Sequence, residues 1–178
     1  MAGTRQTFDH DRALTYRFEP RAGDIDRMRR LVTAADVFSA LEREIALELL
    51  EERLRVGTQS DYYFIFAELG RSLVGYAAWG PVPMTAASYD LYWIVVEPAF
   101  QGRGVGQALL ERTETAIAAR GGGRLYIETS SREPYARTRR FYLSAGYLEA
   151  ARFEDFYSQG DAKVVYCKPL PAIESPPK

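Results

Sequence analysis

The sequence has very little of what metal sites and disulfide frameworks require. Its 178 residues include one cysteine, Cys167, and one histidine, His10. A single cysteine excludes an intrachain disulfide and is compatible with a reducing compartment. One histidine and one distant cysteine do not supply the ligands of a zinc site, so we expect no metal.

Signals for membranes and nucleic acids are also missing. No apolar run approaches the ~20 residues that span a bilayer, and residues 1–11 are polar, unlike a signal peptide. The formal net charge is −1 and both signs are spread along the chain, so we expect no nucleic-acid or membrane surface. The expected location is cytoplasmic.

The length fits one domain with a core of its own. We expect this domain over residues 14–170, after a loose segment at residues 1–13. Prolines 169, 171, 176 and 177 crowd the end of the chain, so residues 171–178 are expected to form a Pro-rich disordered tail.

Hydrophobic periodicity alternates between helical and strand spacing along the chain. A first helix is expected from Asp24, with this residue as the N-cap. Glycines and prolines separate the segments, including a tight turn at residues 70–71 within a hairpin. Strands are predicted over 14–19, 62–69, 72–79, 88–96, 124–129, 147–156 and 163–168, and further helices over 39–56, 104–120 and 134–145.

This order predicts an α/β fold with a mixed sheet. The strand–helix–strand unit over residues 88–129 should form a right-handed parallel crossover. The hairpin before it favours antiparallel pairing there. Helices are expected on both faces of the sheet.

A glycine-rich loop, Gln101-Gly102-Arg103-Gly104-Val105-Gly106, lies between a buried strand and an amphipathic helix. A helix N-terminus presents free N–H groups and the positive end of the helix dipole, which together stabilise anions. Gly-Lys-Ser/Thr is absent, which excludes a triphosphate loop, and the spacing departs from the dinucleotide fingerprint. A turn that serves only helix–strand packing is the alternative interpretation.

Residues 94–110 resemble the acetyl-coenzyme-A-binding motif of the GNAT superfamily, Gln/Arg-x-x-Gly-x-Gly/Ala after an apolar strand that ends in Val-x-Pro. A second segment, residues 139–147 (RRFYLSAGY), is similar to the family's Phe/Leu-Tyr-x-x-x-Gly-Phe/Tyr signature. The resemblance extends over about residues 14–170. It implies a mixed, mostly antiparallel seven-stranded sheet with helices on both faces and a splayed parallel pair of central strands.

The resemblance also implies how acetyl-coenzyme A (acetyl-CoA) binds. Loop amides would hold the pyrophosphate, and the strand before the loop would pair with the pantetheine arm. Relatives carry asparagine and alanine at two helix positions where this chain has Tyr135 and Thr138. One arginine of the group 132, 137, 139 and 140 would reach the 3′-phosphate. The expected coenzyme-binding residues are Ile94, Val95, Val96, Gln101, Gly102, Arg103, Gly104, Val105, Gly106, Gln107, Tyr135 and Thr138.

For catalysis, the resemblance implies direct attack of an amine on the thioester within a ternary complex. Tyr142 matches the acid that protonates the leaving thiolate. Glu128 is the first candidate for the base and Asp90 the second, while Glu97 could act through water. Their ordinary alternatives are a packed tyrosine and hydrogen-bonded or solvated carboxylates.

The implied function is N-acetyl transfer from acetyl-CoA to a primary amine, with a non-catalytic acyl-CoA sensor or scaffold as the alternative. The acceptor, a small molecule or a peptide, stays open. By the same resemblance, residues 35–39 and 153–161 would shape its pocket. Edge strands near the C-terminus often pair in this family, so the resemblance also implies a homodimer. Aromatic residues expected near the acceptor are Tyr92, Trp93, Phe153, Phe156 and Tyr157.

Overall fold

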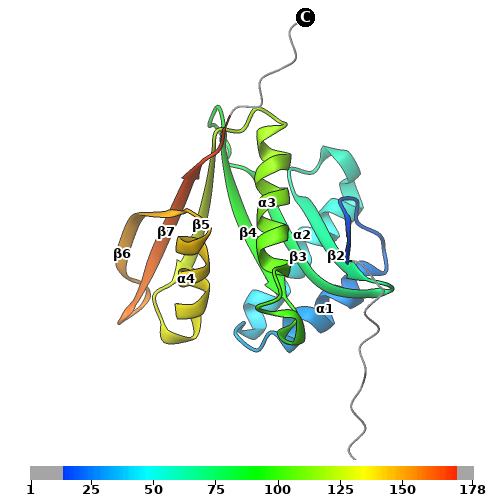
Figure 1. The fold of residues 1–178 in the computed structure, drawn as a ribbon, viewed down its shortest axis with the longest axis horizontal. Helices are drawn as coiled ribbons and strands as arrows, with labels where there is room; N and C mark the ends of the chain where they lie inside the picture. The colour runs from blue at the N-terminus through cyan, green and yellow to red at the C-terminus, as the bar shows by residue number, and fades with distance from the viewer. Residues whose placement is uncertain (1–13, 172–178) are drawn as a thin grey trace, which may run out of the picture.

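A computed structural model describes residues 14–171 of the chain (Figure 1). The predicted loose segment at residues 1–13 and all of the predicted tail except Pro171 lie outside these residues. Within residues 14–171, no helix has both the length and the apolar character that crossing a bilayer requires.

The described chain contains seven strands and four α-helices in the predicted order, and their ends agree with the prediction to within about two residues. Three short 3₁₀ turns lie between them: η1 (Gly57–Gln59), η2 (Pro98–Phe100) and η3 (Glu133–Tyr135). The main elements are β1 (Leu14–Arg17), α1 (Asp24–Ala34), α2 (Ala40–Val56), β2 (Tyr63–Leu69), β3 (Ser72–Pro81), β4 (Ser88–Val96), α3 (Val105–Ala118), β5 (Arg124–Ser130), α4 (Ala136–Ser144), β6 (Leu148–Ser158) and β7 (Asp161–Pro169).

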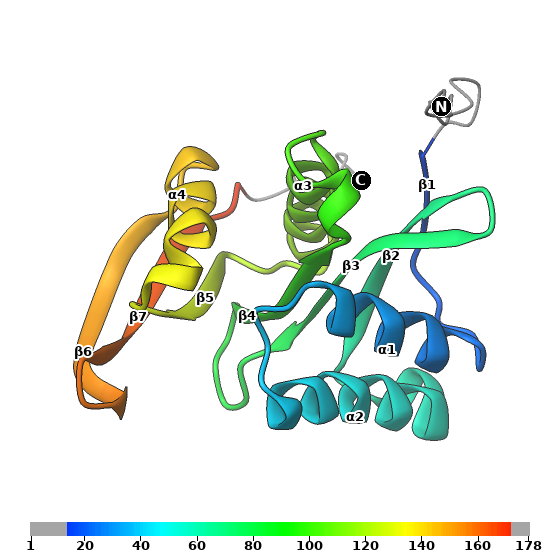
Figure 2. The same cartoon turned by 90° about the horizontal axis from the view of Figure 1, so that it is seen from below.

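The strands form one sheet in the order β1-β2-β3-β4-β5-β7-β6. Every neighbouring pair is antiparallel except β4 and β5. Helices α1 and α2 cover one face, and α3 and α4 cover the other (Figure 2). The predicted mixed, mostly antiparallel seven-stranded sheet is therefore confirmed.

Each face of the sheet has its own core, because each helix turns an apolar stripe toward the strands. The stripes recur at three- and four-residue spacing along α1, α2 and α3. Against one face pack Met28, Leu31 and Val32 of α1 with Ala46, Leu47 and Leu50 of α2, and against the other Val105, Leu109, Leu110 and Ile117 of α3.

The parallel pair separates after a short paired stretch. β4 and β5 pair from Ser88↔Arg124 to Leu91↔Ile127 and no further. At this point β4 carries a bulge: the register with β3 shifts so that Tyr92 is the extra residue. Because a bulge bends its strand and increases its twist, it accounts for the direction in which β4 leaves β5. The predicted splayed pair is confirmed.

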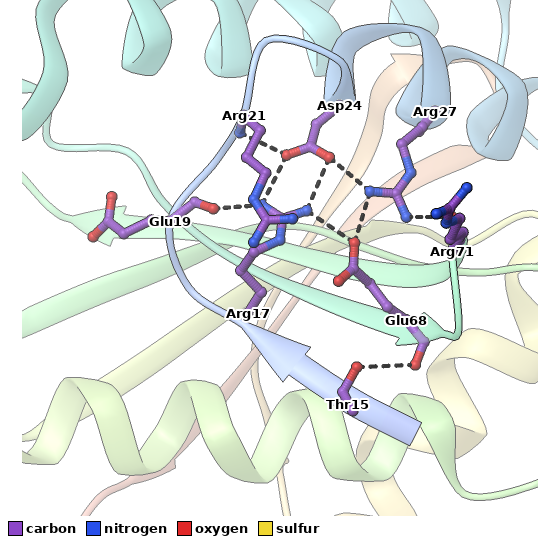
Figure 3. A network of polar contacts seen from close by, with 8 residues as sticks. All are labelled: Thr15, Arg17, Glu19, Arg21, Asp24, Arg27, Glu68 and Arg71. Atoms are coloured by element: carbon purple, nitrogen blue, oxygen red, sulfur yellow. Dashed lines mark hydrogen bonds and ion pairs between the residues drawn. The ribbon is translucent and has the colours of Figure 1, made fainter. Parts of the chain in front are cut away.

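The N-cap prediction for Asp24 is wrong by one position. Gly23 occupies the N-cap, and Asp24 is the first residue of α1. Its carboxylate is 1% exposed and pairs with Arg17 at 2.9 Å and Arg27 at 3.1 Å. Glu68 of β2 accepts hydrogen bonds from the same two arginines at 3.1 and 2.7 Å (Figure 3). Asp24 therefore joins a charged network that ties β1, α1 and β2 together, which local sequence does not reveal.

β3 continues beyond its predicted end, through Gly80 to Pro81. A glycine is required at position 80, because a Cβ there would lie 2.4 Å from the backbone oxygen of Asp61. Pro81 pairs with Tyr89 as the last residue of the strand, where a missing N–H removes no bond from the sheet interior. The glycine and proline that suggested a break thus serve a close approach and a strand end.

The segment between the last two strands also differs from the expected loop over residues 153–161. β6 reaches Ser158 and β7 starts at Asp161, so the connection is two residues long. β6 bends at Asp155, whose φ is 54°. The Asp155 carboxylate accepts a hydrogen bond from the N–H of Gly160 and holds this bend in place.

Candidate active site

The glycine loop has the geometry that an anion site requires. Gly102 and Gly104 have φ values of 75° and 82°, a region that side chains with a Cβ rarely adopt. Gly104 is the N-cap of α3, and no side chain of the described residues caps this helix end. Within residues 14–171, no backbone oxygen accepts a bond from the N–H groups of Val105, Gly106 or Gln107. These three donors and the helix dipole together form a site for an anion.

Two connected depressions start at this loop. The first, which we call the loop groove, has a volume of about 310 Å³. The second, which we call the cleft cavity, has a volume of about 650 Å³ and lies where β4 and β5 diverge. The two share Ile94, Val96, Gln101, Arg137 and Thr138. The loop groove is lined by these five and by Gly102, Gly104, Gly106, Gln107 and Phe141.

Most of the residues predicted to bind the coenzyme line one of these depressions. Val95 and Tyr135 line the cleft cavity. The Arg103 and Val105 side chains line neither depression. The Arg103 guanidinium lies 5.7 Å from the centre of the Phe100 ring, and Val105, the first residue of α3, is buried in the core between this helix and the sheet. Beyond Leu91, the edge of β4 that faces β5 has no strand partner in the described part of the chain. Its backbone is therefore free to pair with an extended ligand.

Tyr142 is brought to the cleft cavity by α4. Its side chain is 4% exposed and packs between the rings of Tyr147 and Tyr166, with centroids 6.1 and 5.8 Å away. No residue within 14–171 hydrogen-bonds its hydroxyl group. Burial raises the pKa of Tyr142 above that of a free tyrosine, which is already protonated at neutral pH. A protonated, unpaired hydroxyl is what a proton donor requires.

The two candidate bases have different surroundings. Glu128 lines the cleft cavity, and both of its carboxylate oxygens lie 3.1 Å from Nζ of Lys163. Asp90 is half-buried and does not line the cavity. Burial and the charge of Glu128 raise the pKa of Asp90, and Lys163 lowers it in part. Glu97 is also outside the cavity lining. The structure therefore brings only Glu128 of the three directly to the cavity.

Comparisons with known proteins agree with this geometry. A family model described as an acetyltransferase (GNAT) domain matches residues 60–149, about half of the chain. A crystal structure of a GNAT-family protein from Desulfovibrio desulfuricans is 38% identical, with a TM-score of 0.88, and the match covers 89% of this chain and 100% of that one. The chain belongs to the GNAT acetyltransferase family.

Two curated relatives of this GNAT protein match it over shorter stretches. Mycothiol acetyltransferase of Beutenbergia cavernae is 30% identical over 126 residues, which are 68% of this chain and 41% of the relative. N-alpha-acetyltransferase RimI of Mycobacterium tuberculosis is 33% identical over 96 residues, which are 53% of this chain and 58% of the relative. The matches span about half the length of these relatives.

Arg137 is the loop-groove residue that the sequence only pointed to as one of four arginines. Its Nη1 donates to Oε1 of Gln101 at 3.0 Å, and a Cβ added at Gly102 would lie 3.6 Å from its Nη2. The Gln101 amide in turn donates to the backbone oxygen of Val96 at 3.1 Å. Arg137 thus holds a positive charge over the anion site. Its position on the predicted helix was available from sequence, but the direction of its side chain was not.

The segments that the sequence analysis expected to shape the acceptor pocket line the cleft cavity only in part. The α1–α2 loop lines it through Ala35, Val37, Phe38 and Ser39, as expected. Of the aromatic residues, Tyr92, Trp93 and Tyr157 line it, whereas Phe153 and Phe156 do not and are about half exposed. The sequence interpretation missed Glu42, an acidic residue of the lining, whereas Asp161, which also lines the cavity, ends the predicted segment 153–161.

Tyr135 reaches away from the loop groove. Its hydroxyl lies 3.2 Å from the backbone oxygen of Val37 and 3.2 Å from Oε1 of Glu42. Burial and the Glu42 carboxylate raise the pKa of Tyr135 to about 12. Glu42 also forms a capping box with Ser39 at the start of α2, so the contact with Tyr135 is a second role of this carboxylate.

Proposed function

We propose that this GNAT protein transfers an acetyl group from acetyl-CoA to a primary amine. The observation that carries the proposal is the continuity of the loop groove with the cleft cavity. One end of this path has an uncapped helix N-terminus, and the other has the unpaired hydroxyl of Tyr142. A diphosphate bound at the first end would place an extended arm along β4 toward the second.

The donor side fits coenzyme A in three respects. The N–H groups of Val105, Gly106 and Gln107 and the charge of Arg137 suit a diphosphate. The free edge of β4 suits the amides of a pantetheine arm. Acetyl-CoA, once bound, supplies the acetyl group as a thioester.

Side chains of the protein would then accept a proton from the amine and donate a proton to the leaving thiolate. A lysine-like amine has a pKa of about 10.4 and is protonated at neutral pH, so a carboxylate must first accept its proton. Glu128 lines the cavity, and its charge acts on Asp90, whose pKa it raises. As the amine nitrogen bonds to the acetyl carbon and the carbon–sulfur bond breaks, the Tyr142 hydroxyl donates its proton to the sulfur. The nitrogen then loses its second proton to leave the neutral amide, and through solvent this proton restores the tyrosine hydroxyl.

A thiol-release assay with acetyl-CoA and a panel of amines tests the proposal. The panel contains peptides with free N-termini, polyamines, aminoglycosides and single amino acids. We expect turnover with at least one member and an acetylated amine detected by mass spectrometry. Tight coenzyme binding without turnover on any amine would instead support a non-catalytic acyl-CoA sensor. Calorimetric preference for ATP over acetyl-CoA would overturn both.

We also propose a homodimer, because β6 forms one edge of the sheet and almost all of its residues are exposed. Analytical ultracentrifugation tests this, and a single monomeric species at micromolar concentration would contradict it.

A further inference from the structure

Two side chains at the start of α4 reach in opposite directions across the cleft. Tyr135 closes the turn η3 and bonds to the α1–α2 loop and the first turn of α2. Arg137, two residues later, bonds to Gln101 of the glycine loop. The same short segment thus contacts the acceptor side of the cleft cavity through one residue and the loop groove through the other.

The Tyr135 contact joins two parts of the protein that the sheet holds together weakly at this point. η3 follows β5, whereas the α1–α2 loop belongs to the part built on β1–β4. β4 and β5 pair over only four residue pairs before they diverge. Beyond that stretch the cleft cavity separates the two parts, and the Tyr135 side chain crosses between them at the acceptor side.

Glu42 is a firm anchor for this contact. Its Oε2 accepts a hydrogen bond from the N–H of Ser39 at 2.7 Å, and its own N–H donates to Oγ of Ser39 at 3.2 Å. The carboxylate is therefore fixed at the N-terminus of α2 by a complete capping box. The other carboxylate oxygen, Oε1, is available to accept from the Tyr135 hydroxyl. The bond to Tyr135 therefore fixes η3 relative to the start of α2 and to residues 35–39.

We propose that Tyr135 is a positioning residue for the acceptor: it ties the α1–α2 loop across the mouth of the cleft cavity and so shapes the acceptor pocket. This inference rests on the proposed acetyl transfer. The hydroxyl shares its one proton between a carboxylate oxygen of Glu42 and the backbone oxygen of Val37, and neither residue lines the loop groove. Loss of the tie should therefore affect acceptor binding and leave coenzyme binding as it is.

The test is Tyr135→Phe, which removes the hydroxyl and keeps the ring. A hydrogen bond to a charged group is worth about a factor of ten in an equilibrium, so we expect the acceptor KM to rise about tenfold. The kcat at saturating acceptor and the Kd for coenzyme A should stay within about twofold. Hydrogen–deuterium exchange of residues 35–42 should be about tenfold faster than in the wild type.

Arg137→Gln is the matched variant on the opposite side, where we expect the reverse: a Kd for coenzyme A raised about tenfold and an acceptor KM within about twofold. Ser39→Ala is the control for fraying of α2, because it weakens the capping box without removing a Tyr135 partner. We expect Ser39→Ala to lower the melting temperature. We expect its acceptor KM to rise less than that of Tyr135→Phe.

Two results would overturn the inference. They are an unchanged acceptor KM in Tyr135→Phe, or a rise in the Kd for coenzyme A as large as the rise in KM. A KM rise in Ser39→Ala instead agrees with the inference, because the capping box holds the Glu42 anchor, and leaves these two as the refuting outcomes. If the wild type acetylates no amine, the proposed function fails by itself. The exchange of residues 35–42 then decides the tie, and unchanged exchange in Tyr135→Phe refutes it.

Discussion

Replacement of Tyr142 by phenylalanine separates a catalytic role of this residue from a packing role. The change removes one oxygen atom and retains the ring that packs against Tyr147 and Tyr166. Because no residue within 14–171 bonds to the hydroxyl, the folded protein loses no hydrogen bond. The free energy of unfolding should therefore change by less than about 1 kcal/mol.

The expected effect on turnover is much larger. General acid catalysis typically contributes about 10²- to 10⁴-fold. A coenzyme thiol resembles cysteine, whose pKa is about 8.5, and so leaves fairly well without a proton. We therefore expect kcat to fall by between about tenfold and a thousandfold, or about 1.4 to 4 kcal/mol of transition-state stabilisation.

Thiol release at saturating acetyl-CoA and amine measures this loss, with calorimetry for the Kd of coenzyme A and thermal unfolding for stability. Tyr166→Phe is the matched control, because it makes the same change in the adjacent ring, which does not line the cleft cavity. A kcat in Tyr142→Phe equal to that of Tyr166→Phe would remove Tyr142 from the mechanism. A large fall in coenzyme affinity or in melting temperature would also refute the reasoning.

Three other predictions concern the base, the strand β3 and the charged network. If Glu128 is the base, Glu128→Gln lowers kcat/KM at least tenfold while Asp90→Asn retains activity; full activity of both variants across pH excludes both residues. If Asp90 is the base, the acidic limb of the pH profile lies above the ordinary carboxylate range, because burial and Glu128 raise its pKa, and it disappears in Asp90→Asn. Gly80→Ala should lower the free energy of unfolding by about 2 kcal/mol or more in urea titrations, because the alanine Cβ would lie 2.4 Å from a backbone oxygen. A variant as stable as the wild type would contradict this close approach. Burial raises the pKa of Glu68, but hydrogen bonds from two arginines outweigh this effect and lower the pKa overall. The contribution of Glu68 to stability is therefore present above its unfolded pKa and is lost as the pH falls through its folded pKa. Glu68→Gln should flatten this acid limb in a plot of melting temperature against pH, and an unchanged slope would argue against this contribution.

The sequence alone determined the order of the elements and the place of the donor site. Helical and strand periodicities differ, so Ser88–Val96 and Val105–Ala118 could be distinguished without a structure. The glycine loop could be predicted from sequence for a similar reason. Positive φ at Gly102 and Gly104 and an uncapped helix start are local properties, set by residues that are adjacent in the chain.

Only the tertiary structure decided which side chains meet across the cleft. The sequence placed Tyr135 on the donor side, but its hydroxyl lies against Glu42, which is 93 residues away in the chain. In the same way, Asp24 is a residue type that favours the N-cap, but in the structure it belongs to an ion network with Glu68 of β2. Such contacts depend on how β4 and β5 diverge and how the helices pack on each face of the sheet. The glycine loop proposed to bind the donor consists of adjacent residues and was predicted from sequence, whereas the cleft cavity proposed to bind the acceptor is assembled from distant segments and was predicted only in part.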